Sequence, residues 1–198
     1  MFSFFGGGHG AYFNGDGLNH GNAPISTATI PPLEILESAY PIVFKKWALR
    51  EDSGGAGEFR GGLGAIYEIQ MLENNSTVSL FGERGKFPPR GIAGGEPALE
   101  NKCTFYKSDK SITLPLISKG VGITLNSGET VKLETPGGGG YGNPLKRSVD
   151  RVCNDVSKRY ISIESAKYVY GVIINAEGKL DNKRTEKLRL EHHSNEDT

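Results

Sequence analysis

The sequence of 198 residues has little cysteine, little methionine and no long apolar run. Its two cysteines, Cys103 and Cys153, are isolated and lack CxxC spacing, which argues against a thiolate metal site and indicates a reduced, cytoplasmic protein. No apolar run approaches the roughly 20 residues that a membrane span needs. The opening MFSFFGGG lacks the basic residues and cleavage site of a secretory signal. We therefore expect no membrane partner.

A surplus of charge is also absent. The formal net charge is +0, and residues 145–198 carry 11 basic and 9 acidic side chains. Binding to nucleic acid or to an anionic membrane requires clustered, surplus Lys and Arg. The sequence therefore predicts neither as the main partner.

Glycine is abundant but unevenly placed, with 26 of the 28 glycines before Pro144. Apolar residues make up 36% of the chain, which is low for a self-sufficient core. A short helix over 33–40 is expected to end at Pro41, which has no amide proton. Short alternating runs then predict strands at 42–49, 65–71 and 77–81 and, from Lys102 onward, at CTFYK, SITLPLI, GITL and TVKLET. SGE at 127–129 predicts a hairpin turn between the last two strands.

The residues after Pro144 change period. Val149, Val152, Cys153 and Val156 have helical spacing, with Ser148 as N-cap. A second short helix is expected from Ser162 to Gly171, then a strand at VIIN and a polar helix over 182–193. We predict a mainly β body with glycine-rich turns over residues 1–144 and a small C-terminal α/β tail over 145–198, α+β overall.

Three glycine-rich strings are the strongest local signal: DSGGAGEFRGG at 52–62, FPPRGIAGG at 87–95 and ETPGGGGYG at 134–142. Clustered glycines either expose successive amides that bind an anion or make tight turns where strands pack closely. None is a P-loop. The candidates for binding a substrate or an anion are Asp52, Ser53, Gly54, Gly55 and Arg60. Alternatively, Asp52 and Arg60 pair with each other and fix the loop.

A metal site and a catalytic centre have weaker signals. His9, Asp16, Asn19 and His20 lie close together in the sequence, and Asp16 and His20 are candidate metal ligands, although HxH and HxxxH spacing is absent. The chain has no GxSxG motif, and no nucleophile has a recognisable base beside it. The catalytic residues stay unknown.

The ordered strings resemble those of the hydantoinase B/5-oxoprolinase family. Pro32, Glu34, Leu36, Glu37 and Pro41, followed by residues 52–64, are similar to the family's central signature. FPPRGIAGGEP and ETPGGGGYGNP resemble two later blocks, and residues 151–189 resemble the closing segment, in which a YGV strand precedes a D-x-x-x-T helix. The resemblance covers nearly the whole chain but only about the last third of a family subunit.

The resemblance implies part of an ATP-dependent hydrolase of cyclic amides, of the 5-oxoprolinase or N-methylhydantoinase type. It connects the chain with glutathione metabolism. ATP with Mg is expected to be bound by a hydantoinase A-type partner subunit. A divalent metal is expected, if at all, in the missing N-terminal B portion, which is the second expected partner. Alone, the chain is expected to be inactive.

Two alternatives stay open. Ile30 and Pro31 replace the Asn-Thr of the pattern N-T-P-[IV]-E seen in many hydantoinase-like members, so an acetone/acetophenone carboxylase-like subunit is the second candidate. The third is a non-catalytic assembly piece or a gene remnant. In any of these, residues 2–5 and 42–49 are expected to contribute to an apolar surface that a partner covers.

Overall fold

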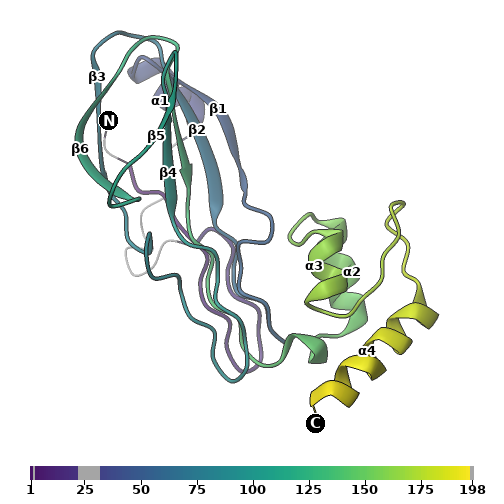
Figure 1. Cartoon of the computed structure of the whole chain (residues 1–198). Coiled ribbons are helices and arrows are strands. Elements are labelled where there is room, and N and C mark those ends of the chain that lie inside the picture. Colours follow the sequence, from purple (N-terminus) through teal and green to yellow (C-terminus); the bar gives the residue numbers. More distant parts are fainter. Residues whose placement is uncertain (2, 22–31, 197–198) are drawn as a thin grey trace.

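A five-stranded antiparallel sheet forms one end of the molecule, and a helical tail lies at the other end (Figure 1). The computed structural model describes residue 1, residues 3–21 and residues 32–196. The sheet has the order β1-β2-β7-β4-β5. Its strands are β1 (Ile42–Leu49), β2 (Ala65–Met71), β4 (Lys102–Tyr106), β5 (Ser111–Thr113) and β7 (Thr130–Glu134). The predicted α+β fold with a mainly β body is therefore confirmed.

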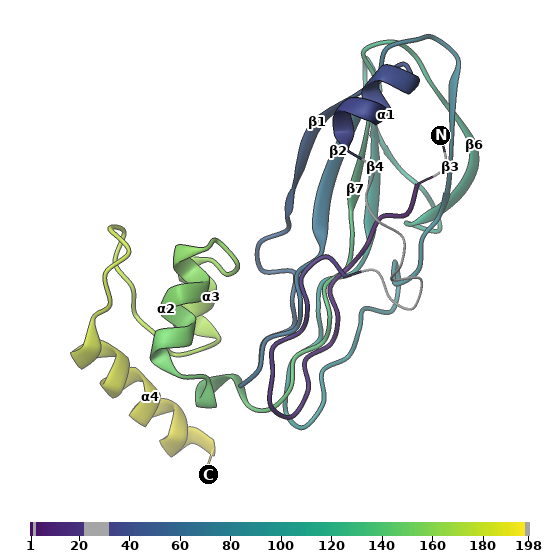
Figure 2. The same ribbon diagram turned by 180° about the vertical axis from the view of Figure 1, so that it is seen from behind.

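The first elements follow the predicted pattern closely. Helix α1 (Leu33–Ala39) ends before Pro41 and lies across β1, as Figure 2 shows from behind. In β2 the alternation predicted from the sequence is complete, because every second residue from Ala65 to Met71 is buried. These residues form the centre of the main core together with Cys103, Phe105, Val131 and Leu133.

A separate ribbon of two strands, β3 (Ser76–Phe81) and β6 (Lys119–Leu125), faces this core. The predicted hairpin between the last two strands is wrong: a turn at 127–128 does separate β6 from β7, but the two strands join different sheets. β6 pairs with β3, whereas β7 lies between β2 and β4. The turn residues alone did not reveal this, because the choice of partner depends on segments about 50 residues earlier in the chain.

Below the sheet, four glycine-rich segments run side by side in both views (Figures 1 and 2). We call residues 6–17, 53–64, 90–96 and 135–142 the glycine bundle. Backbone hydrogen bonds join its segments directly: Gly62 N donates to His9 O, Gly138 N to Gly62 O, and Gly140 N to Glu96 O, at 2.8, 2.9 and 3.0 Å. The bundle therefore extends the body through main-chain contacts between extended segments.

Side chains are excluded from the inside of the bundle. A Cβ atom on Gly61 would lie 1.8 Å from Gly138 O, and one on Gly138 would lie 1.8 Å from His9 O. Non-bonded atoms cannot approach this closely, so only glycine allows the backbones to meet. The high glycine content of the first 144 residues is thus explained mainly by close packing of backbone against backbone.

The tail is tied together by capped helices. In α2 (Val149–Ser157) and α3 (Ile163–Tyr168), Ser148 and Ser162 accept hydrogen bonds from backbone amides of the first turn, as predicted. α3 ends at Tyr168, before the predicted Gly171. A 3-10 turn, η1 (Pro144–Lys146), links the tail to the body.

The predicted VIIN strand is wrong, since this segment forms only the isolated bridge Ile174↔Leu180. The polar helix is present as α4 (Asn182–Glu196). Its D-x-x-x-T motif has a structural role, because Asp181 N donates to Ile173 O and Ile173 N donates to the buried Thr185 hydroxyl. The motif therefore holds α4 against the preceding extended segment in place of a strand ladder.

Replacing Gly138 tests the glycine bundle. We expect Gly138→Ala to destabilise the fold by more than about 3 kcal/mol, because the new methyl would overlap backbone atoms of His9 and Gly10. Gly10→Ala is the matched control: its Cβ would meet only Gly139 O at 3.9 Å, and a change within about 0.5 kcal/mol is expected. Urea unfolding measures the stability of both variants. An equal loss of unfolding free energy in both would contradict the close backbone packing around Gly138.

Candidate functional site

Several amides of the glycine strings are used within the fold. Ser53 is fully buried; its hydroxyl donates to Arg50 O at 2.5 Å and accepts from Gly64 N at 2.9 Å. Gly55 N donates to Gly138 O, and a Cβ on Gly54 would lie 2.2 Å from Gly61 O. The candidate segment around residues 53–55 is therefore inside the bundle, with its hydrogen-bonding groups used by the fold.

The alternative that Asp52 pairs with Arg60 is wrong. Asp52 has a left-handed backbone, φ 58°, and its carboxylate accepts from Ser162 N at 3.0 Å. Its own amide donates to Tyr160 O. Asp52 thus connects the body to the start of α3, whereas the Arg60 guanidinium lies beside Asp155.

A buried charge cluster lies where the bundle meets the tail, and we define it as Asp16, Arg60, Arg147 and Asp155. Arg147, 1% exposed, donates to both oxygens of Asp16 at 2.7 and 2.8 Å and to one Asp155 oxygen at 2.7 and 3.1 Å. The Arg60 guanidinium lies 3.4 Å from the same Asp155 oxygen. Arg147 and Asp155 are therefore paired out of water, whereas the Asp16 side chain is 31% exposed and, within the described residues, the buried Arg60 Nε has no hydrogen-bond partner.

The cluster favours the ionised state of Asp16. Burial opposes ionisation of Asp16, but the hydrogen bonds and charge of Arg147, with help from Arg60, lower the pKa of Asp16. Burial likewise works against the Arg147 cation, and the hydrogen bonds and charges of the two acids outweigh it, so the pKa of Arg147 is raised. Asp16 and Arg147 therefore stay ionised and paired, as expected of residues with a structural role.

The sequence did not point to Arg147 and Asp155. The only available signal was position: Asp155 lies three residues after Val152, on the same buried face of α2. A charged residue there needs a partner, because an unpaired buried carboxylate is costly.

The metal prediction finds no support in the arrangement. Asp16 lies in the charge cluster, where Arg147 occupies both its oxygens, whereas His20 contacts the Tyr67 hydroxyl. Asn19 accepts from Leu63 N and from Arg60, so it fixes the N-terminal loop to the bundle. Across residues 1, 3–21 and 32–196, no three His, Cys, Asp or Glu side chains gather as a metal site. These residues do not fit a divalent ion.

Tyr67 and His20 belong to an aromatic cluster rather than to a catalytic pair with solvent access. Tyr67 is fully buried, 4.6 Å from the Phe5 ring centroid and 4.8 Å from that of Trp47. Burial raises the pKa of the Tyr67 phenol and lowers the pKa of His20. The cluster holds the N-terminal segment against β1 and β2.

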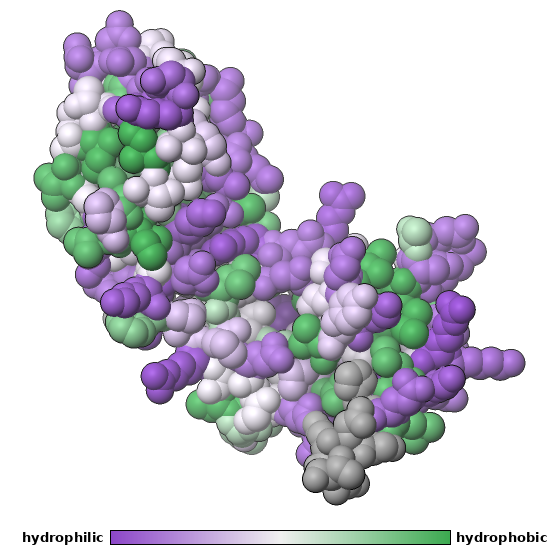
Figure 3. Space-filling view, viewed as in Figure 1, coloured by the Kyte–Doolittle hydropathy of each residue, from purple (hydrophilic) through white to green (hydrophobic). Residues whose placement is uncertain are grey.

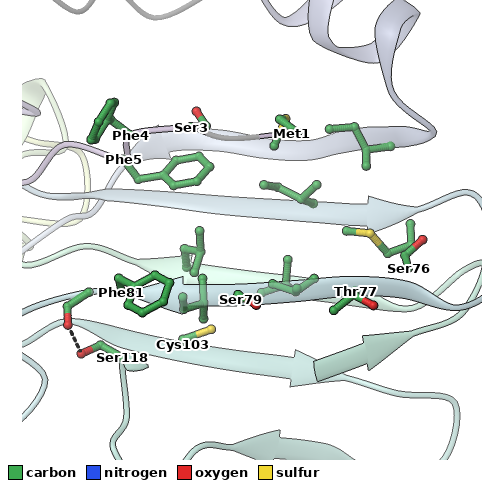
Figure 4. A pocket seen from close by; sticks show the side chains of 18 of the residues that line it. Met1, Ser3, Phe4, Phe5, Ser76, Thr77, Ser79, Phe81, Cys103 and Ser118 are labelled. Atoms are coloured by element: carbon green, nitrogen blue, oxygen red, sulfur yellow. Dashed lines mark hydrogen bonds between the residues drawn. The ribbon is translucent and has the colours of Figure 1, made fainter. Parts of the chain in front are cut away.

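A partly open apolar cavity of about 560 Å³ lies between the sheet and β3. Figure 4 shows Phe5 on one side of it and Thr77, Ser79 and Phe81 of β3 on the other. Cys103 lies on its floor, and burial raises the pKa of this thiol to about 12, so it is not a thiolate nucleophile at neutral pH. Phe4, Phe5 and Ile42 line it, from the two segments expected to form a partner surface, whereas Phe2 lies outside the described residues.

Comparison with known proteins agrees with this picture. Residues 1–144 match the family described as hydantoinase B/oxoprolinase. The chain is 39% identical to the β subunit of caprolactamase from Pseudomonas jessenii over 168 residues, which is 81% of this chain and 28% of that subunit. It is 36% identical to a 5-oxoprolinase of Dictyostelium discoideum over 144 residues, 69% of this chain and 10% of that protein.

Solved structures show the same fold. The crystal structure of the ATP-dependent caprolactamase from Pseudomonas jessenii superposes with a TM-score of 0.81 at 33% identity, covering 94% of this chain and 33% of that one. The nucleotide-free acetone carboxylase gives 0.78 at 25% identity, covering 96% and 30%. The chain thus spans a third or less of these relatives. In the described part of the chain, no helix has both the length and the apolar character needed to cross a membrane.

Removing Arg147 tests the charge cluster. We expect Arg147→Met to cost about 3–5 kcal/mol of unfolding free energy, because Asp16 and Asp155 would lose their shared cation. Arg184→Met, which breaks an exposed pair with Asp181, is the control and should cost less than about 1 kcal/mol. Thermal or urea unfolding measures the stability of the two variants. A similarly small loss of unfolding free energy in both would show that the charge cluster does not hold the tail to the body.

The pH dependence of Asp16 gives a second test. Since its folded pKa lies below the ordinary 3.8, its ionic contribution is fully present above that pH and is lost as the pH falls through the folded value. The stability gap between wild type and Asp16→Asn should therefore narrow only below pH 3.8. Urea unfolding between about pH 2 and pH 7 measures this gap. A gap that narrows well above pH 3.8 would show that the carboxylate is not held in its ionised form.

Proposed function

Because the chain belongs to the hydantoinase B/oxoprolinase family, we propose that it is a structural part of a subunit that takes part in ATP-dependent hydrolysis of a cyclic amide. The observation that carries the proposal is the match to caprolactamase subunit β, which extends over 81% of this chain in sequence and 94% in structure. The likeness to 5-oxoprolinase supports the same class of substrate.

The contacts favour a supporting role for this part of the subunit. Many of the glycine amides donate to backbone carbonyls, and the charged side chains beside them pair with each other. ATP and its Mg therefore do not fit the glycine strings, and we assign them to a hydantoinase A-type partner. The reacting groups are assigned to the portion of the B-type subunit outside this chain.

The location and pathway follow from the same proposal. Both cysteines are free, which supports a reducing, cytoplasmic location. If the substrate is 5-oxoproline, as in the related 5-oxoprolinase, the reaction would belong to glutathione metabolism.

A carboxylase subunit is the second candidate. The acetone carboxylase superposes over 96% of the chain with a TM-score only slightly lower than that of caprolactamase. Ile30 and Pro31 in the sequence also depart from the hydantoinase-like pattern. The substrate test below distinguishes the two, because carboxylation consumes bicarbonate or CO₂ whereas lactam opening consumes water.

A chimeric subunit tests the proposal. We expect the caprolactamase β subunit, with its matching region replaced by this chain, to support ATP-dependent caprolactam hydrolysis together with the remaining caprolactamase subunits. The isolated chain should turn over neither caprolactam nor 5-oxoproline with ATP. A chimera carrying Gly138→Ala is the inactive control. Turnover by the isolated chain, or a well-folded chimera that carboxylates acetone but opens no lactam, would contradict the proposal.

A further inference from the structure

One edge of strand β3 is open in the described part of the chain. β3 pairs with β6 on one side only, and the pair forms a ribbon of two strands. Its sequence, STVSLF, has no charge and no proline and is rich in β-branched and aromatic residues. Such an edge presents free backbone donors and acceptors and is prone to pair with another chain.

The edges of the five-stranded sheet are protected in contrast. β1 carries the exposed Lys45 and Lys46 and an irregularity between Phe44 and Lys46, and β5 has only three residues. Lysines, bulges and short strands are the devices that prevent edge pairing. The lack of any charge on β3 is therefore a local exception within the same protein.

The cavity lies along this open edge. All residues from Ser76 to Gly82 line it, whereas no residue of β6 does. Its floor includes Ile69, Cys103 and Val131 from three strands of the sheet, and its far wall is the segment with Phe5 (Figure 4). The cavity is therefore bounded by the open edge of β3 and by an apolar floor, and it leaves space beside β3 for further side chains.

The walls suit apolar side chains better than a polar small molecule. Asn101 donates to Glu83 O, Ser118 donates to Gly82 O, and the Thr135 hydroxyl accepts from Ala65 N, so their main polar groups are already bonded. Apolar surface also continues outside the cavity: Phe81 is 81% and Val121 74% exposed. In Figure 3 hydrophobic side chains gather at the end of the molecule that carries β3 and β6.

We propose that the open edge of β3 accepts a β-strand from the part of the hydantoinase B-type subunit that this chain does not include. The strand would extend the β3–β6 ribbon, and its inward side chains would fill the cavity over the five-stranded sheet. This inference rests on the proposed function, since the chain spans 28% of the related caprolactamase subunit and the remaining part supplies the strand. Main-chain pairing gives the affinity, and alternate apolar side chains give the fit.

Binding to the complementary part of the Pseudomonas jessenii caprolactamase β subunit, expressed separately, tests the inference. Thr77→Lys places a charge on β3 beside the cavity, and we expect it to weaken binding at least about tenfold. Thr124→Lys is the matched control: it is the exposed cross-strand partner of Thr77 but does not line the cavity, and it should change binding less than about twofold. Calorimetry measures the affinity, and hydrogen exchange should show new protection of β3 amides in the complex.

The outcomes separate the two proposals. A tight complex in which Thr77→Lys and Thr124→Lys bind alike, with β3 amides unprotected, overturns the strand inference and leaves the proposed function standing. Failure of the chain to bind the complementary part overturns both. A dimer of the isolated chain that Thr77→Lys disrupts, without any effect on the complex, assigns the edge to a second copy and also overturns the inference.

Discussion

The whole body depends on backbones that pack directly against each other in the glycine bundle. Four segments meet at distances that exclude even a methyl group at most of their glycines, and backbone hydrogen bonds join the segments. This gives a rigid element without helices, regular strands or a large apolar core, which explains how a chain with 36% apolar residues keeps a fixed shape. The bundle also sets the positions of Asp16, Asp52 and Arg60, because all three lie in or beside its segments.

The charge cluster follows from that rigidity. Side chains leaving the bundle at fixed places meet α2, so Arg147 can bind Asp16 from the first segment and Asp155 from the helix at the same time. Buried ion pairs contribute little net stability compared with apolar packing, but they tolerate no misplacement. We infer that, together with the Asp52 contact to Ser162, they contribute to one orientation of the tail against the body.

Local sequence patterns predicted most helices and strands, whereas contacts between segments distant in sequence could not be predicted from them. Alternation predicted β2, and capping residues predicted the starts of α2 and α3, because these signals lie within a few residues of each other. The partner of β6 and the true partners of Arg60 depend on residues far away in sequence. The glycine strings indicated correctly that the backbone lacks room for side chains. They did not distinguish anion binding from backbone packing, because both uses need the same residues and differ only in the group that contacts the glycines.

The two ends of the body differ in how complete they are. At the bundle end, most close approaches are backbone to backbone, and the tail covers one side through paired charges. At the sheet end, the main core has a five-stranded floor but only a two-stranded ribbon above it, with an apolar cavity between them. The body therefore has its own framework at the bundle end, whereas at the sheet end the strand that we propose to pair with β3 would complete the second layer over the core.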